Sequence, residues 1–490
     1  MWGQDRLAKE WGVHHTQVLQ TDHNESLAAT IELSLTSPLF CGLGPNARDL
    51  LGVIAFFPQG VDENKLEWLF PTIPNGQTII DKFCVLSLTY RSGNFITMLA
   101  PLRDYLCPKD PKSSPLFCTT KECYFNRLSV EVGPSETGFE EAKWIMSEDV
   151  NVEHLLDVFT MTNTGSDDVW NTCAHFMEHL YWHKPRLVML GPKVKGLPDD
   201  RASKPKCLYQ LSRLFRQVGN HVEEKHLLTY TLELWRGQGN KFQVAVVLEM
   251  LAKANQMLGL YTEGIQLVKE SLGVFEQLSH TIGQADSLWQ LAELLKEDEQ
   301  LDAAEEAISK SISLLLGKDE ALFRICQSYR LLGDICHSKG ETEKAINHFE
   351  TALGIASTSN WDSQCFWIFD ALAEVFFHQG RFDDAHAHIG HAKLHAMNDT
   401  YKLCRMMEKQ ANYWYKEGRI EEAKSEVLCA ISGYERLGGI KDVEDCMELL
   451  QKIEMEQLAV SGDPDPIGEP LETILLPINI EPTPSVHGTV

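Results

Sequence analysis

The chain has 490 residues, and its 44 Lys and Arg against 70 Asp and Glu give a formal net charge of -26 at pH 7. This acidic excess argues against nucleic acid and anionic membrane surfaces as partners, because both require a basic binding surface. No stretch of about 18 apolar residues predicts a membrane span, and the N-terminus lacks the apolar core of a signal peptide. The 13 scattered cysteines fit a reducing compartment, so we expect a cytoplasmic protein.

Residues 26–110 predict a small domain, and we assign no element to residues 1–25 before it. Apolar residues follow helical spacing in 26–36 and in 45–57. A second helical stretch over 78–92 comes next, followed by a hydrophobic hairpin that ends in a helix. We therefore expect a helical domain with a short hairpin.

This order resembles the winged-helix end of NB-ARC and NACHT ATPases. Residues 54–60 (IAFFPQG) are similar to the phrase S-x-F-P-E-G that opens the winged helix in that family. The family's closing M-H-D motif would align with residues 98–100 (MLA), so the histidine that contacts ADP in relatives is absent. A P-loop is absent too, because the one Gly-Lys pair, in residues 317–319, is followed by aspartate. The resemblance implies a winged-helix-like domain that binds no nucleotide cofactor.

Two further motifs match signatures of enzymes. Residues 42–47 (GLGPNA) match the dinucleotide fingerprint G-x-G-x-x-A, but no buried strand precedes them, so a turn at a helix start is favoured. Residues 175–179 (HFMEH) match H-x-x-E-H, in which two histidines bind zinc and glutamate is the base. They lie on a predicted amphipathic helix within a helical connector, 111–204. A zinc-dependent hydrolase built on His175 and His179 is the alternative function, although we predict no metal site. Solvated side chains rather than metal ligands are favoured for three histidines on one face of a later helix, His388, His391 and His395.

Six copies of one pattern follow each other over residues 205–458, roughly 40 residues apart. A first column of small residues consists of Ser212, Ala252, Ala292, Gly333, Ala373 and Ala411. A second column consists of Gly264, Ala304, Ala345, Ala385 and Ala423, with Glu224 departing in the first copy. Small side chains let two antiparallel helices approach closely, and glycines at the turns allow a positive φ. Residues 441–457 read as a helix that caps the last copy.

These columns resemble the tetratricopeptide repeat, although the usual period is about 34 residues. The fold class is therefore all-α: a tetratricopeptide-repeat superhelix of about six helix pairs, preceded by the winged-helix-like domain. Together the two parts resemble STAND-type, NLR-like proteins of basidiomycete fungi that carry NB-ARC and tetratricopeptide regions, here without the ATPase core.

The repeat family binds ligands on a concave surface lined by the first helix of each pair. Carried over by position, the resemblance implies a ligand groove lined by Asp286, Trp289, Glu293, Gln327, Arg330, Asp334, Trp367, Asp370, Glu374, Arg405, Glu408 and Asn412. Aromatic anchors with acids and arginines suit a peptide or protein segment, and the acids favour a basic one.

The last segment, 459–490, is rich in proline and acidic residues and is predicted to be disordered. The function that we expect is a non-enzymatic protein–protein interaction scaffold, the sensor half of an NLR-like regulator. A degraded gene fragment without independent function is a further alternative.

Overall fold

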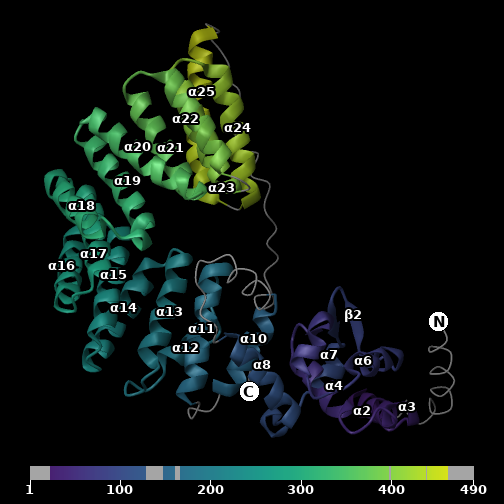
Figure 1. Cartoon of the computed structure of the whole chain (residues 1–490). Coiled ribbons are helices and arrows are strands. Elements are labelled where there is room, and N and C mark those ends of the chain that lie inside the picture. The colour runs from purple at the N-terminus through teal and green to yellow at the C-terminus, as the bar shows by residue number, and fades with distance from the viewer. Residues whose placement is uncertain (1–22, 129–146, 161–165, 397–398, 438, 462–490) are drawn as a thin grey trace, which may run out of the picture. The chain divides into compact units, whose positions relative to one another are not determined.

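The computed structural model describes residues 23–128, 147–160, 166–396, 399–437 and 439–461 (Figure 1). The chain divides into two compact units, Met1–Gln300 and Leu301–Val490, which are described separately. Most of the predicted N-terminal segment 1–25, and the predicted tail from residue 462 onward, lie outside the described residues. In the described part of the chain, no helix is both long and apolar enough to cross a bilayer.

The first unit begins with short helices and a small antiparallel sheet in the strand order β1-β3-β2. Its elements in chain order are α2 (His23–Leu35), α3 (Pro38–Cys41), α4 (Ala47–Phe56), β1 (Val61–Asp62), η1 (Glu63–Lys65), α5 (Leu66–Leu69), α6 (Gly76–Val85), β2 (Tyr90–Ser92), β3 (Phe95–Thr97) and α7 (Ala100–Leu106). The helix predicted over 78–92 is too long, because α6 ends at Val85 and residues 90–92 form β2. Residues 42–47 join two helices, α3 and α4, so no strand precedes them and the dinucleotide fingerprint is excluded.

Residues 54–60 end in a turn at Gly60, and this turn is hydrogen-bonded to Asn151. Gly60 has a φ of +79°, and a Cβ added to it would lie 2.2 Å from the carbonyl oxygen of Ile96 in β3. The side chain of Asn151 donates to the Gly60 carbonyl at 2.8 Å and accepts from the backbone N–H of Gln59 at 2.9 Å. Only glycine fits this close approach of backbone to backbone.

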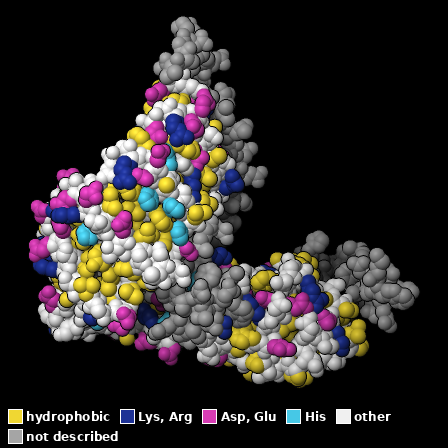
Figure 2. Space-filling model, turned by 45° about the horizontal axis from the view of Figure 1, so that its top comes forward, with side chains coloured by type: hydrophobic (Ala, Val, Ile, Leu, Met, Phe, Trp, Pro, Cys, Tyr) yellow, Lys and Arg dark blue, Asp and Glu magenta, His cyan; other side chains and the backbone are white. Residues whose placement is uncertain are grey.

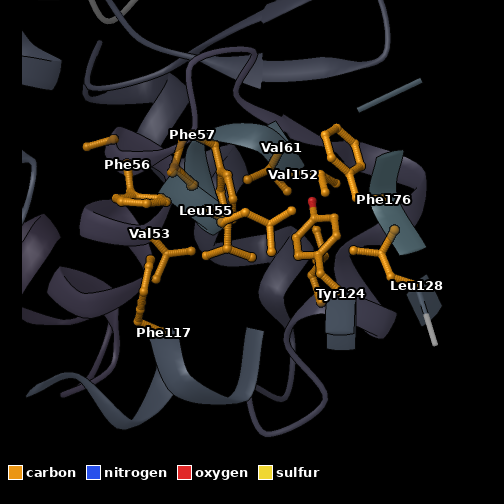
Figure 3. Packing of buried hydrophobic residues seen from close by; sticks show 14 of the residues in the cluster. Val53, Phe56, Phe57, Val61, Phe117, Tyr124, Leu128, Val152, Leu155 and Phe176 are labelled. Atoms are coloured by element: carbon orange, nitrogen blue, oxygen red, sulfur yellow. The ribbon is translucent and has the colours of Figure 1, made fainter. Parts of the chain in front are cut away.

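The connector consists of η2 (Pro111–Ser113), α8 (Pro115–Leu128), α10 (Asp149–Thr160), α11 (Asp167–His183) and α12 (Gly191–Lys195). One hydrophobic cluster extends from Ile31 to Leu227, so it continues across the predicted domain boundary at residue 110. Figure 3 shows its centre, where side chains of α4, α8, α10 and α11 meet. Phe56 packs edge-on against Phe117, with ring centroids 4.6 Å apart.

A buried ion pair lies beside this cluster. Lys65 Nζ donates to Glu148 Oε1 at 2.6 Å, and both side chains are almost completely buried. Tyr124 and Asn151 donate to the other carboxylate oxygen of Glu148, at 2.5 Å and 3.2 Å. These hydrogen bonds satisfy a charge that would otherwise be costly to bury.

Within each unit, the remaining helices form antiparallel pairs of similar length (Figure 1), as the repeated pattern predicts. The first unit holds α13 (Lys204–Gln217), α14 (His221–Gly237), α15 (Lys241–Met257), α16 (Tyr261–Gln277) and α17 (Thr281–Glu297). The second unit holds α18 (Leu301–Leu315), η3 (Asp319–Ala321), α19 (Leu322–Ser338), α20 (Thr342–Thr358), α21 (Asp362–His378), α22 (Phe382–His395), α23 (Thr400–Lys416), α24 (Ile420–Leu437) and α25 (Ile440–Ser461). The helix predicted to cap the last copy is α25.

The small-residue columns lie where the helices of a pair cross, and most of their members are completely buried. Gly333 of α19 lies against the ring of Phe349 in α20, where an added Cβ would be 2.7 Å from the ring. Glu224, which departs from the second column, is buried and bonded to Arg216 and to His221, at 2.5 Å and 3.0 Å. The structure therefore confirms the all-α repeat fold. The first copy, which has Glu224 in place of a small residue, also forms a helix pair.

Candidate functional site

The twelve residues predicted to line a groove fall in both compact units. Asp286, Trp289 and Glu293 lie on α17 of the first unit, where Lys253 donates to Glu293 at 2.8 Å. The other nine lie on α19, α21 and α23 of the second unit, which are the first helices of three successive pairs. We call the following side chains the first-helix face: Arg330, Asp334, His337, Trp367, Asp370, Glu374, His378, Arg405 and Lys409.

Asp370 of α21 is the centre of this face and is only 6% exposed. Lys409 of α23 donates to its carboxylate, and also to its backbone carbonyl at 3.2 Å. Arg405, one helical turn earlier on α23, places Nε 3.6 Å from the other carboxylate oxygen. Lys409 also donates to Glu374 at 3.0 Å, so one lysine joins two acids of α21.

Arg405 also lies over the indole ring of Trp367, with Cζ 5.3 Å from the ring centroid. The guanidinium is therefore held between an aromatic face and a buried carboxylate. Its side chain is still 45% exposed. An arginine fixed in this way keeps N–H donors available while losing little conformational entropy on binding.

The acids of this face are paired with cations of the same face. Arg330 contacts Asp334 at 3.0 Å within α19, and Asp370 and Glu374 are held by α23. Figure 2 shows the same interspersion of acidic and basic side chains on the surface that it presents. Each of the three acids of the first-helix face therefore has a cation within 4 Å.

Three further predicted groove residues of the second unit, Gln327, Glu408 and Asn412, are partly buried or bonded within their own helix pair. Glu408 accepts from the hydroxyl of Tyr434 in α24 at 3.1 Å, so its carboxylate is engaged within its own helix pair. Burial raises the pKa of Glu408. Gln327 and Asn412 are partly buried on α19 and α23.

Sequence reasoning missed Lys409, His337 and His378. Lys409 follows Arg405 by four residues, and residues at that spacing share a helix face. His337 and His378 occupy the last turns of α19 and α21. The spacing of four residues therefore indicated that Lys409 shares a helix face with Arg405. The prediction missed these three residues because it used only three fixed positions of each first helix.

The two histidines of the H-x-x-E-H motif in α11 have different surroundings. His179 is buried in the core, and this burial lowers its pKa to about 4. His175 instead lies 3.3 Å from Lys206 Nζ, measured from its Nε2. Among the described residues, two other groups of three side chains have ligand atoms within 4.8 Å of one another. One group is His337, Glu374 and His378, and the other is Glu305, Cys336 and Glu341.

The three histidines of α22 that the sequence predicts to be solvated also contact an aromatic side chain. Their rings stack on Phe369 of α21, with centroid distances of 5.8, 5.1 and 5.5 Å for His388, His391 and His395. Burial also lowers the pKa of His388. An imidazole ring can cover an aromatic side chain while one edge stays in water, and His391 is exposed as the sequence predicts.

Comparisons with known proteins support the repeat fold. A family model described as tetratricopeptide repeat matches residues 327–359, which cover most of α19 and α20. Protein KINESIN LIGHT CHAIN-RELATED 1 of Arabidopsis thaliana is 23% identical over 235 residues, which are 43% of this chain and 38% of that protein. Protein KINESIN LIGHT CHAIN-RELATED 3 of the same plant is 21% identical over 222 residues, 42% of this chain and 33% of that protein. The chain thus spans less than two fifths of the length of these curated relatives.

Two solved structures are similar at low identity. A STAND protein with a tetratricopeptide repeat sensor from Pyrococcus horikoshii has a TM-score of 0.49 and 13% identity, covering 93% of this chain and 70% of its own. A Rap protein in complex with competence and sporulation factor has a TM-score of 0.43 and 13% identity, covering 69% of this chain and 98% of its own. An NB-ARC or NACHT domain and a fungal origin stay predictions. The family model identifies residues 327–359 as a tetratricopeptide repeat, and the chain folds as a superhelix of such helix pairs.

Proposed function

We propose that this chain is a non-enzymatic protein–protein interaction scaffold that binds a peptide or protein segment on the first-helix face of its second unit. The observation that carries the proposal is Arg405, which is held between Trp367 and Asp370 yet stays half-exposed. Tryptophan and arginine are the side chains that most often dominate binding energy at protein interfaces.

The contacts of this face favour a particular kind of ligand. An apolar or aromatic side chain of the ligand would pack beside Trp367, and a carbonyl or carboxylate group would accept from the exposed edge of Arg405. Glu374, which is 49% exposed in its side chain, would accept from a donor of the same segment. Because the face presents both signs of charge, it gives no preference for a strongly basic ligand.

The winged-helix interpretation of residues 26–110 is part of this proposal. The element order helix, strand, helix, helix, strand, strand, from α4 to β3, supports it, as does the antiparallel strand order. With the repeats, it supports a role as the sensor half of an NLR-like regulator in the cytoplasm. Purified chain should then neither bind ATP or ADP tightly nor hydrolyse ATP, and tight binding with turnover would contradict a non-enzymatic role.

Peptide binding can be tested by selection from a random peptide library on the purified chain. Fluorescence anisotropy then measures the selected peptides against Trp367→Ala and Arg405→Ala. We expect each variant to weaken binding by about tenfold or more, because hot-spot truncations cost more than about 1 kcal/mol. Arg436→Ala is the matched control, since Arg436 lies exposed on the second helix α24, where its guanidinium donates to Ser432 of the same helix. Selected peptides that bind both variants as tightly as the unchanged chain would place the ligand elsewhere.

A further inference from the structure

Two histidines and one glutamate meet where the last turns of α19 and α21 lie side by side. His337 comes from α19, and Glu374 and His378 come from α21 at a spacing of four residues, so both face the same way. One ligand atom from each of the three lies within 4.8 Å of the others. The packing of the two first helices therefore assembles a compact set of nitrogen and oxygen donors.

The distance between the imidazole nitrogens is close to the distance that a metal ion requires. His337 Nε2 lies 3.1 Å from His378 Nδ1, and the two rings are stacked at 21° with centroids 5.2 Å apart. Zinc binds histidine nitrogen at about 2.0–2.1 Å in tetrahedral geometry, which places two such nitrogens about 3.3 Å apart. A shift of a few tenths of an ångström would therefore open this pair to a shared ion.

We propose that His337, Glu374 and His378 form a binding site for a divalent transition-metal ion, Zn²⁺, on the first-helix face. Two imidazoles and one carboxylate are a known zinc ligand set, and nitrogen donors disfavour Mg²⁺ and Ca²⁺. Three protein ligands leave a fourth position for water or for a group of a bound partner. The site does not rest on the proposed peptide binding, because the ion alone is the ligand.

Two features set the expected strength of this site. Lys409 donates to Glu374 Oε2 at 3.0 Å, so a cation already holds one of the two carboxylate oxygens. His337 Nδ1 is buried and has no hydrogen-bond partner among the described residues, so a second-shell acceptor is lacking there. Both features weaken metal binding, and a missing second-shell partner alone costs about 10–100-fold in affinity. We therefore expect a site of moderate affinity.

The second compact group of potential ligands, Glu305, Cys336 and Glu341, is a poorer candidate. Lys339 donates to Glu305 at 2.6 Å, and Lys344 contacts Glu341 at 2.8 Å. The Cys336 thiol is buried, and this burial raises its pKa, which disfavours the thiolate that would ligate. Its acids are already neutralised by lysines, so this group carries no proposal.

A competition titration with Zn²⁺ and a chromophoric chelator, on the full reduced chain, tests the site. We expect the unchanged chain to bind one more equivalent of Zn²⁺ than His378→Gln, or to bind it at least about tenfold more tightly. His391→Gln is the matched control, because His391 is an exposed histidine on α22 and lies outside the cluster. Circular dichroism checks that each variant is folded, and His378 is itself exposed. Equal zinc binding by the unchanged chain and His378→Gln would overturn the proposal, and so would an equal loss in His391→Gln.

Two additional measurements test whether His337, Glu374 and His378 are the residues that bind the metal. Co²⁺ in a site of low coordination number absorbs strongly in the visible region, and we expect this absorption to disappear in His337→Asn and in Glu374→Gln. Lys409→Gln removes the competing cation from Glu374 and should tighten Zn²⁺ binding several-fold. Unchanged Co²⁺ absorption in both ligand variants, or weaker Zn²⁺ binding by Lys409→Gln, would count against the site.

Discussion

Glu249 offers the sharpest test of how the repeats handle buried charge. It lies on α15 of the first unit, and Ser287 of α17 donates to its Oε1 at 2.5 Å. Burial is the main cause that raises the pKa of Glu249 to about 7, with a contribution from Asp286, and the hydrogen bond from Ser287 only partly opposes it. We predict that Glu249→Gln, which keeps the shape and an acceptor oxygen, stabilises the first unit at alkaline pH.

The magnitude follows from the difference between the folded and unfolded pKa values. The ordinary value is 4.5 and the folded value about 7, so between these pH values the folded chain holds a proton that the unfolded chain has lost. The free energy of unfolding therefore falls as pH rises through this window, by about 3 kcal/mol in total. Below pH 4.5 the carboxyl is neutral in both states and contributes no penalty.

Urea unfolding followed by circular dichroism measures this effect at pH 5 and at pH 8. We expect Glu249→Gln to increase the free energy of unfolding of the transition that includes α15, by about 2 kcal/mol more at pH 8 than at pH 5. Glu276→Gln, on the exposed side of α16, is the control for the loss of a carboxylate from a helix of the same unit. An equal change at the two pH values would refute the reasoning, because it would trace the effect to packing and not to ionisation.

Three further substitutions test the packing described above. Glu148→Ala removes the nearer of two carboxylate partners of the buried Lys65 and leaves Asp62 at 3.5 Å, so it should lower the free energy of unfolding in chemical denaturation by up to about 3–5 kcal/mol. Gly60→Ala forces a Cβ against the backbone of β3 at a positive φ and should lower the melting temperature far more than Gly93→Ala, whose added Cβ meets nothing within 4 Å. Gly333→Val should cost about 1–3 kcal/mol by overpacking the crossing of α19 and α20, whereas Gly354→Val, at an open helical position, should cost less in the same denaturation assay.

The repeats could be predicted from the sequence because their packing depends on local size. Ala252 and Ala373 are completely buried where two helices cross, and any larger side chain there would separate the helices. Turn residues are equally local: Gly259 and Gly380 adopt a positive φ, and Glu299 adopts one without being glycine. A pattern that recurs every 40 residues or so therefore carries most of the fold.

The pairing of side chains on the first-helix face could not be predicted in the same way. The position of Asp370 was predicted, but not that Lys409 and Arg405 of the next first helix would both reach it. Such contacts depend on how successive helix pairs are rotated against each other, which small differences in repeat length alter. The His337–His378 contact has the same origin, since it joins residues 41 positions apart.

The charge of the chain takes on a different meaning once these pairs are known. An acidic excess in the sequence favoured a basic ligand, yet Asp370 is 6% exposed and its charge is matched by two cations. What the face still offers to a ligand are groups of opposite sign, the exposed parts of Arg405 and Glu374. Recognition by such a surface depends on matching donors and acceptors in position, because net attraction contributes little where the signs alternate over a few ångströms. A ligand of this face should thus be distinguished by its sequence of side chains and not by its overall charge.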